Sequence, residues 1–97
     1  MNEARYQKKL IDKLEVMFPG CYISKNDPRS RQGVPDILIL FNDNWGMLEV
    51  KMANDSDVQP NQSHYVNVFN EMSFASFINP QNEEQVLNDL QHALGVA

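Results

Sequence analysis

Cysteine is nearly absent from this sequence of 97 residues: Cys21 is the only one, so no disulfide can form within the chain. A chain without disulfides is typical of a reducing, intracellular setting. No apolar run approaches the ~18 residues that a membrane-spanning helix needs, and the charged start MNEARYQKKL lacks the apolar segment of a secretory signal. No repeat or linker-like segment divides the chain. We therefore expect a single domain over residues 1–97, cytoplasmic and without membrane contact.

Positive charge is missing from the second half of the sequence. All eight lysines and arginines lie within residues 1–51, whereas the later residues carry six of the 13 acids and no Lys or Arg. The net charge of −5 taken alone argues against a nucleic-acid partner. Its uneven distribution nevertheless predicts one face for an anionic partner and another turned away from it. A randomly mixed surface explains the charge pattern equally well.

Apolar spacing predicts three helices and four strands. Pro19-Gly20 ends the first helical pattern, Pro60 stands at the first position of the second helix, and Gly95 stops the third. The order αβββαβα indicates an α/β fold with a mixed sheet flanked by helices, in which the second helix joins two parallel strands. The expected elements are a helix at 2–18, strands at 21–25, 36–41 and 45–52, a helix at 60–72, a strand at 74–78 and a helix from 79 to 94.

The two central strands carry charges that a purely structural hairpin does not need. They lie in the segment GVPDILILFNDNWGMLEVK. Side chains alternate between the faces of a strand, so a register that unites Ile37 and Leu48 on one apolar face brings Asp36, Glu49 and Lys51 together on the other. Two converging carboxylates can hold a hard divalent cation such as Mg²⁺. A neighbouring lysine can orient a metal-bound water or help to deprotonate it.

The first helix contributes a further acid. Its apolar stripe, which includes Tyr6, Leu10 and Leu14, is centred close to Glu3, while Glu15 falls at the edge of the stripe. An acid on a core-facing stripe is costly unless it is paired or coordinated. Glu3 is therefore the expected helix acid at the sheet end that carries the other carboxylates, and a solvated helix terminus is the alternative.

The charged residues form a known pattern. Pro35-Asp36, twelve intervening residues and Glu49-Val50-Lys51 resemble the PD-(D/E)xK signature of a large nuclease superfamily. The superfamily's restriction-endonuclease-like core has the same αβββαβ order, so the resemblance covers nearly the whole chain, with the last helix as an addition. Within the superfamily the VRR-NUC (virus-type replication-repair nuclease) family is most similar, and small Holliday junction resolvases are also similar. The segments that carry this likeness are Gly33-Val34-Pro35-Asp36, Leu48-Glu49-Val50-Lys51 and Gln62.

The resemblance implies Mg²⁺-dependent hydrolysis of phosphodiester bonds in branched or otherwise structured DNA, with Mn²⁺ as an expected substitute. It implies that Asp36, Glu49 and the main-chain carbonyl of Val50 bind the metal, and that Glu3 assists them. Lys51 matches the lysine near the attacking water. These are expectations carried over from the family position by position.

The resemblance leaves the role of Gln62 open. Gln62 matches a glutamine that lines the active site in such nucleases, but it also fits the third helical position of a capping box. Gln59 is a weaker candidate for the active-site role.

Four basic residues are the expected contacts to DNA. Arg29 and Arg31 lie in the loop that enters the catalytic strand, and arginine forks suit phosphate oxygens. Lys8 and Lys25 are expected to extend this track. A solvated loop and a solvated helix face are the alternatives for these residues.

Several other functions remain open at this point. The chain can be a nickase or restriction-like cutter of duplex DNA, a non-catalytic DNA-binding module that keeps the nuclease fold, or an unrelated small α/β domain. A homodimer is expected, because resolving a four-way junction needs two symmetric cuts and one domain carries one site.

Overall fold

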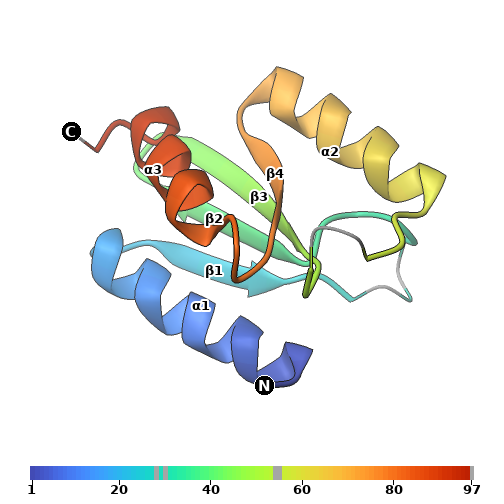
Figure 1. Ribbon diagram of the computed structural model, residues 1–97. Coiled ribbons are helices and arrows are strands. Elements are labelled where there is room, and N and C mark those ends of the chain that lie inside the picture. Colours follow the sequence, from blue (N-terminus) through green and yellow to red (C-terminus); the bar gives the residue numbers. More distant parts are fainter. Residues whose placement is uncertain (28, 30, 54–55, 97) are drawn as a thin grey trace.

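The structure confirms the predicted α/β fold and the order of its elements. It is a computed structural model that describes residues 1–27, 29, 31–53 and 56–96 (Figure 1). In this part of the chain no helix is long and apolar enough to cross a membrane. The elements are α1 (Glu3–Met17), β1 (Tyr22–Lys25), β2 (Ile37–Phe41), β3 (Asn44–Val50), α2 (Pro60–Met72), β4 (Ala75–Ile78) and α3 (Glu83–Ala93).

The four strands form one mixed sheet in the order β1-β2-β3-β4. The pairs β1–β2 and β2–β3 are antiparallel, and β3–β4 is parallel. The two parallel strands are those joined by α2, as the sequence predicts. Parallel neighbours need such a crossover, because a tight turn can join only antiparallel strands.

Helices cover both faces of the sheet (Figure 1). The main core lies between the sheet and the pair α1 and α3, and a smaller apolar cluster lies under α2. The alternating strand pattern sends Ile37, Ile39, Leu48 and Val50 to the main core, as predicted. The intervening residues of β2 and β3 therefore face the α2 side.

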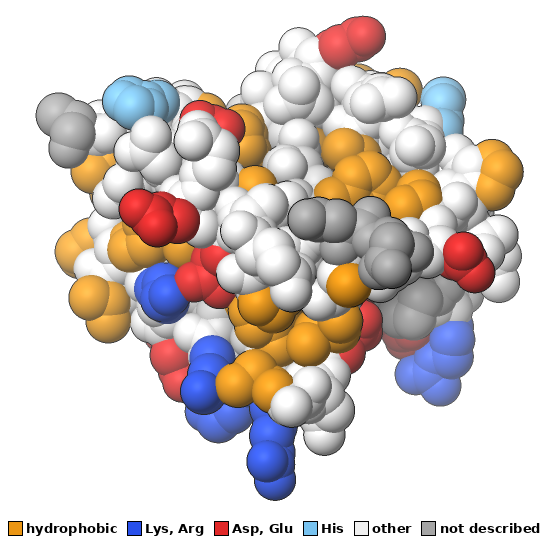
Figure 2. Space-filling view, viewed as in Figure 1, with side chains coloured by type: hydrophobic (Ala, Val, Ile, Leu, Met, Phe, Trp, Pro, Cys, Tyr) orange, Lys and Arg blue, Asp and Glu red, His pale blue; other side chains and the backbone are white. Residues whose placement is uncertain are grey.

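Charge is unevenly distributed over the surface. Figure 2 shows Lys and Arg side chains along the lower part of the view, around α1 and the loop region at the right. The upper part, formed by α2 and α3, shows none, as required by a sequence without Lys or Arg after Lys51. The basic side chains thus gather on one part of the surface, around α1 and the loop region.

The strand β3 is shorter than predicted. It ends at Val50 rather than at residue 52. The backbone N–H of Lys51 makes one further hydrogen bond, of 2.9 Å, to the carbonyl of Ile78. The neighbouring strand β4 ends at Ile78, so the chain beyond Lys51 has no strand beside it.

The helix α3 begins later than predicted, at Glu83 rather than at residue 79. Side-chain hydrogen bonds hold the preceding residues in a turn. The Asn79 carboxamide oxygen accepts from the backbone N–H groups of Gln81 and Asn82 at 2.9 and 2.8 Å, and that of Asn82 accepts from the N–H of Asn79 at 2.8 Å. Asparagine side chains compete with helical backbone bonds in this way.

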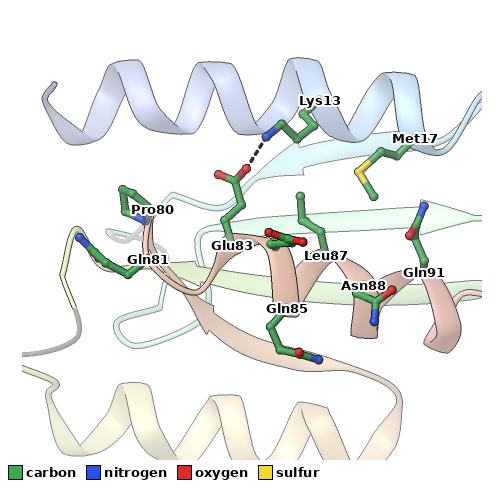
Figure 3. A pocket seen from close by; sticks show the side chains of 10 residues that line it. Lys13, Met17, Pro80, Gln81, Glu83, Gln85, Leu87, Asn88 and Gln91 are labelled. Carbon is green, nitrogen blue, oxygen red and sulfur yellow. Dashed lines mark hydrogen bonds and ion pairs between the residues drawn. The ribbon is translucent and has the colours of Figure 1, made fainter.

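A polar cluster fixes α1 against the start of α3. Glu83 accepts a hydrogen bond from the hydroxyl of Tyr6 at 2.8 Å, and it also pairs with the ammonium of Lys13. Figure 3 shows Lys13 pointing across to Glu83, beside a groove of about 920 Å³ between the two helices. Burial would raise the pKa of Glu83, but the hydrogen bonds from its two partners lower it below its usual value. The cluster therefore holds α1, and with it the position of Glu3.

Candidate active site

Asp36 directly precedes β2 and lies level with Glu49 of β3. Ile37 pairs with Leu48, and one further step along these antiparallel strands brings Asp36 opposite Glu49. The Oδ2 atom of Asp36 accepts a hydrogen bond of 3.0 Å from the backbone N–H of Val50. The register predicted from apolar alternation is confirmed, and it brings the two acids to one end of the hairpin.

Glu49 is an acid in an almost fully buried position. Its residue is 5% exposed, and it faces the α2 side because it alternates with the core residues Leu48 and Val50. Burial, and after it the charge of Asp36, raise the pKa of Glu49 to about 7, while the charge of Lys51 opposes this rise. Two neighbouring carboxylates ionise together only at a cost unless a cation lies beside them. The pair is therefore suited to bind one.

Burial also acts on Asp36. It raises the pKa of Asp36, although the hydrogen bond from Val50 and the charges of Lys51 and Lys25 work in the opposite direction. The two basic side chains thus lie close enough to Asp36 for their charges to act on it. The site combines two partly buried acids with flanking positive charge.

Hydrogen bonds orient both carboxylates. Oδ2 of Asp36 is held by Val50, and Oε2 of Glu49 accepts from Nε2 of Gln62 at 3.2 Å. A hydrogen bond from the backbone N–H of Asp36 to the Glu49 carboxylate lowers the pKa of Glu49 and joins the two acids through the backbone. Mg²⁺ takes oxygen ligands and keeps several waters. The donor set therefore fits Mg²⁺, with the carbonyl of Val50 as the expected third ligand.

Glu3 lies outside this pair of acids. It is the first residue of α1, which packs on the opposite face of the sheet from Glu49, and its side chain is exposed. Its charge adds to the effects of burial and Asp36 in raising the pKa of Glu49. No three His, Cys, Asp or Glu side chains among the described residues converge closely enough to hold a metal ion. The part of Glu3 in metal binding stays a prediction.

Glu15, the other candidate acid of α1, lies at the far end of the helix. Burial raises the pKa of the Cys21 thiol, and the charge of Glu15 adds to this rise, so these two residues are neighbours. Of the two helix acids, Glu3 is the one whose charge acts on Glu49.

Lys51 stands one residue beyond the end of β3, where its backbone is anchored to Ile78. Among the described residues, no carboxylate lies within ion-pair distance of its ammonium. Its charge nevertheless acts on both Asp36 and Glu49. A half-buried ammonium beside the two acids, but not paired with either, remains available to a water or phosphate oxygen.

Gln62 has both of the roles that the sequence left open. Its Oε1 atom accepts from the backbone N–H of Gln59 at 3.0 Å, as in a capping box, while its Nε2 atom donates to Glu49. The cap fixes the orientation of the carboxamide, so that its N–H group faces the carboxylate. Gln59 takes part only in the cap.

The basic residues are not equivalent. Arg29 binds Asp27 of its own loop, with its guanidinium at 3.0–3.3 Å and its backbone N–H at 2.9 Å, and Lys8 forms an exposed pair with Asp12 at 3.5 Å. In the described residues neither Lys25 nor Arg31 forms an ion pair. The residues that line a small cavity of about 170 Å³ are Lys25, Asn26, Asp27, Arg31 and Val34.

Asn26 is a positioning residue that the sequence interpretation missed. Its backbone N–H donates to the carbonyl of Asp36, and its carboxamide donates to the carbonyl of Pro35, both at 2.7 Å. These bonds fix the Pro35-Asp36 backbone against the end of β1. The signal available in the sequence was an asparagine placed directly after a predicted strand, where such side chains often bond to nearby backbone.

No family model, curated protein or solved structure matches the chain.

Proposed function

We propose that this protein is a metal-dependent endonuclease of the PD-(D/E)xK type, with Mg²⁺ as its natural cofactor and Mn²⁺ as a substitute. The observation that supports this most is the pair of Asp36 and Glu49. Both acids are oriented by hydrogen bonds, Asp36 by the backbone N–H of Val50 and Glu49 by the side chain of Gln62. Lys51 lies beside both.

The chain's residues divide the work of phosphodiester hydrolysis among them. Asp36, Glu49 and the Val50 carbonyl would hold Mg²⁺, which when bound stabilises charge on a phosphate and acidifies a bound water. Gln62 orients Glu49 through a hydrogen bond to its Oε2 atom. The ammonium of Lys51 donates hydrogen bonds and so orients the attacking water toward phosphorus. The surrounding burial strengthens each of these electrostatic contacts.

The proposed substrate is DNA, in a branched or otherwise structured form. The positive charge near Asp36 supports an anionic polymer as the partner, and the acidic α2 and α3 region is expected to turn away from it. A homodimer in the cytoplasm of a bacterial or phage-infected cell belongs to the same proposal. The branched form of the substrate rests on the resemblance to resolvases, and a nickase or duplex cutter is the alternative outcome of the test.

The test is incubation of the purified protein with matched four-way, flap, single-strand and linear duplex DNA. Reactions contain Mg²⁺, Mn²⁺ or a chelator. We expect cleavage with either metal, none with the chelator, and a preference for the four-way or flap substrate. Equal cutting of linear duplex would favour the restriction-like alternative. Absence of cleavage on every substrate, with DNA binding retained, would favour the non-catalytic module.

A further inference from the structure

The loop between β1 and β2 is held in place beside the candidate active site. At one end, the two hydrogen bonds of Asn26 tie it to Pro35 and Asp36. Near the other end, Gly33 adopts a left-handed φ of +91° and lies against the side chain of Asn61 at the start of α2. The described residues Asn26 and Gly33 therefore anchor the two ends of the loop beside the site.

Only some of the positive charge in this region is free. The charge of Arg29 is balanced by Asp27, through contacts from its Nε and Nη2 atoms to both carboxylate oxygens. The hydrogen bonds from Arg29 lower the pKa of Asp27, which keeps that carboxylate ionised and paired. Lys25 and Arg31 have no such partner among the described residues. The cavity that these two line therefore carries net positive charge.

The cavity is next to the acid that would hold the metal. Lys25 pairs across β1 and β2 with Ile37, the residue after Asp36, and Asn26, which also lines the cavity, donates from its backbone N–H to the carbonyl of Asp36 at 2.7 Å. The volume of about 170 Å³ is that of roughly five or six water molecules. This space accommodates a phosphate group with its ester oxygens. Lysine and arginine are the side chains that bind such groups.

We propose that Lys25 and Arg31 form a subsite for a DNA backbone phosphate that neighbours the phosphate cut at Asp36 and Glu49, and that Arg29 is not part of it. This inference rests on the proposed nuclease function and refines its substrate class. The substrate must carry a second phosphate beside the scissile one. Internal linkages of a polynucleotide meet this requirement, and isolated phosphodiesters do not.

The test measures binding of a short fluorescein-labelled DNA duplex as a function of salt, with Ca²⁺ in place of Mg²⁺. Each phosphate contact contributes about 0.9 to the slope of log affinity against log salt. Because both side chains are proposed to bind one phosphate, Lys25→Gln, Arg31→Gln and the double variant should each lower the slope by about 0.9 and weaken binding about tenfold at about 0.1 M salt. The control is Arg29→Gln, which removes a charge that lies outside the cavity and should leave the slope unchanged.

The possible failures are distinguishable. Parental slopes for Lys25→Gln and Arg31→Gln, in folded proteins that bind DNA, would overturn the subsite and leave the nuclease proposal intact. Absence of DNA binding by the parent would overturn both. A second measurement uses substrates with one methylphosphonate, an uncharged linkage, next to the cut. It should slow cleavage by the parent about tenfold but not slow cleavage by Lys25→Gln/Arg31→Gln further, and an equal loss in both proteins would contradict the subsite.

Discussion

At the scale of single residues, the geometry of the site depends on the groups that orient the Glu49 carboxylate. Its buried carboxylate receives a hydrogen bond from Gln62, whose other end is engaged in the cap of α2. One carboxamide thus connects a helix terminus to the acid that would bind metal. Its two ends are chemically different, because one accepts and the other donates. Exchanging the carboxamide of Gln62 and the carboxylate of Glu49 between the two positions therefore tests whether this hydrogen bond stabilises the site.

We predict that Gln62→Glu destabilises the metal-free protein and that adding Glu49→Gln restores it. A glutamate keeps the cap acceptor but places a third carboxylate against Glu49, where like charges at low solvation cost about 1–3 kcal/mol. In the double variant the introduced amide donates to the introduced carboxylate. Urea denaturation in chelator measures the free energy of unfolding. Equal destabilisation by Gln62→Glu with and without Glu49→Gln would show that the two side chains do not interact.

Gly33 is a second residue whose identity the structure explains. Its φ of +91° is unfavourable for residues with a Cβ atom, and an ideal Cβ would lie 2.7 Å from Cγ of Asn61. We predict that Gly33→Ala lowers the free energy of unfolding by about 1–3 kcal/mol. Gly33→Ala/Asn61→Ala should recover only part of the steric loss, because Cβ of residue 61 stays 2.9 Å from the ideal Cβ, and none of the part due to φ. A Gly33→Ala protein as stable as the parent would contradict this account of the loop.

At the scale of elements, the contact between α1 and α3 is the most testable feature. Glu83 joins Tyr6 and Lys13 of α1 to the first turn of α3. The pKa of Glu83 is lower in the folded protein than its usual value. Its ionised form therefore stabilises the fold above the unfolded pKa of about 4.3, and this contribution is lost as the pH falls through the folded pKa.

We predict that Glu83→Gln is less stable than the parent at neutral pH and that the difference disappears at acid pH. A glutamine still accepts from Tyr6 but loses the charge that attracts Lys13. Because Lys13 is half exposed, the difference should be at most about 1 kcal/mol. Chemical denaturation from pH 7 down to about pH 3 measures it. A difference independent of pH would show that Glu83 acts by packing rather than by charge.

Apolar sequence patterns predict some features of the helices and strands but not all of their ends. Alternation in the β2–β3 hairpin was sufficient to predict the register and the meeting of Asp36 with Glu49, because a slip by one residue would bury the charged face. The end of β3 depends on where β4 ends, and the start of α3 depends on side-chain bonds of Asn79 and Asn82. Apolar periodicity carries no signal for either.

The sequence also contains no indication of which loop side chains form ion pairs. Arg29 and Arg31 stand two positions apart in the same loop, and the sequence predicts contact with DNA phosphates for both. The structure distinguishes them, because Arg29 folds back onto Asp27 whereas Arg31 does not. For Gln62, the sequence offered two roles as alternatives, and only the three-dimensional arrangement shows that one carboxamide can have both.

At the scale of the whole molecule, the 97 residues carry one candidate site and only eight lysines and arginines. Its eight basic residues all lie in the first half of the chain, and Figure 2 shows the region of α2 and α3 without them. A symmetric pair of domains would supply two sites and a wider basic face. The acidic half is then expected to face away from DNA or to take part in the dimer.

We predict a homodimer in solution at micromolar concentration, with both sites open to the same side. Light scattering coupled to size exclusion measures the mass directly, and addition of four-way DNA should leave two protein chains on each junction. A strict monomer, both free and on DNA, would contradict the paired cutting of junctions and favour a nickase. It would leave the assignment of the carboxylates unchanged.

The proposed function requires that Asp36 and Glu49 bind a divalent metal and that Lys51 assists the hydrolysis of DNA at this site. The most direct test is the rate of Mg²⁺-dependent DNA cleavage by Asp36→Asn, Glu49→Gln and Lys51→Met, with Asp43→Asn in the exposed turn between β2 and β3 as the matched control. We predict that each of the first three lowers the rate at least about 100-fold in a folded protein, and that Asp43→Asn cuts at the parental rate. Parental cleavage by folded Asp36→Asn or Glu49→Gln would contradict the account.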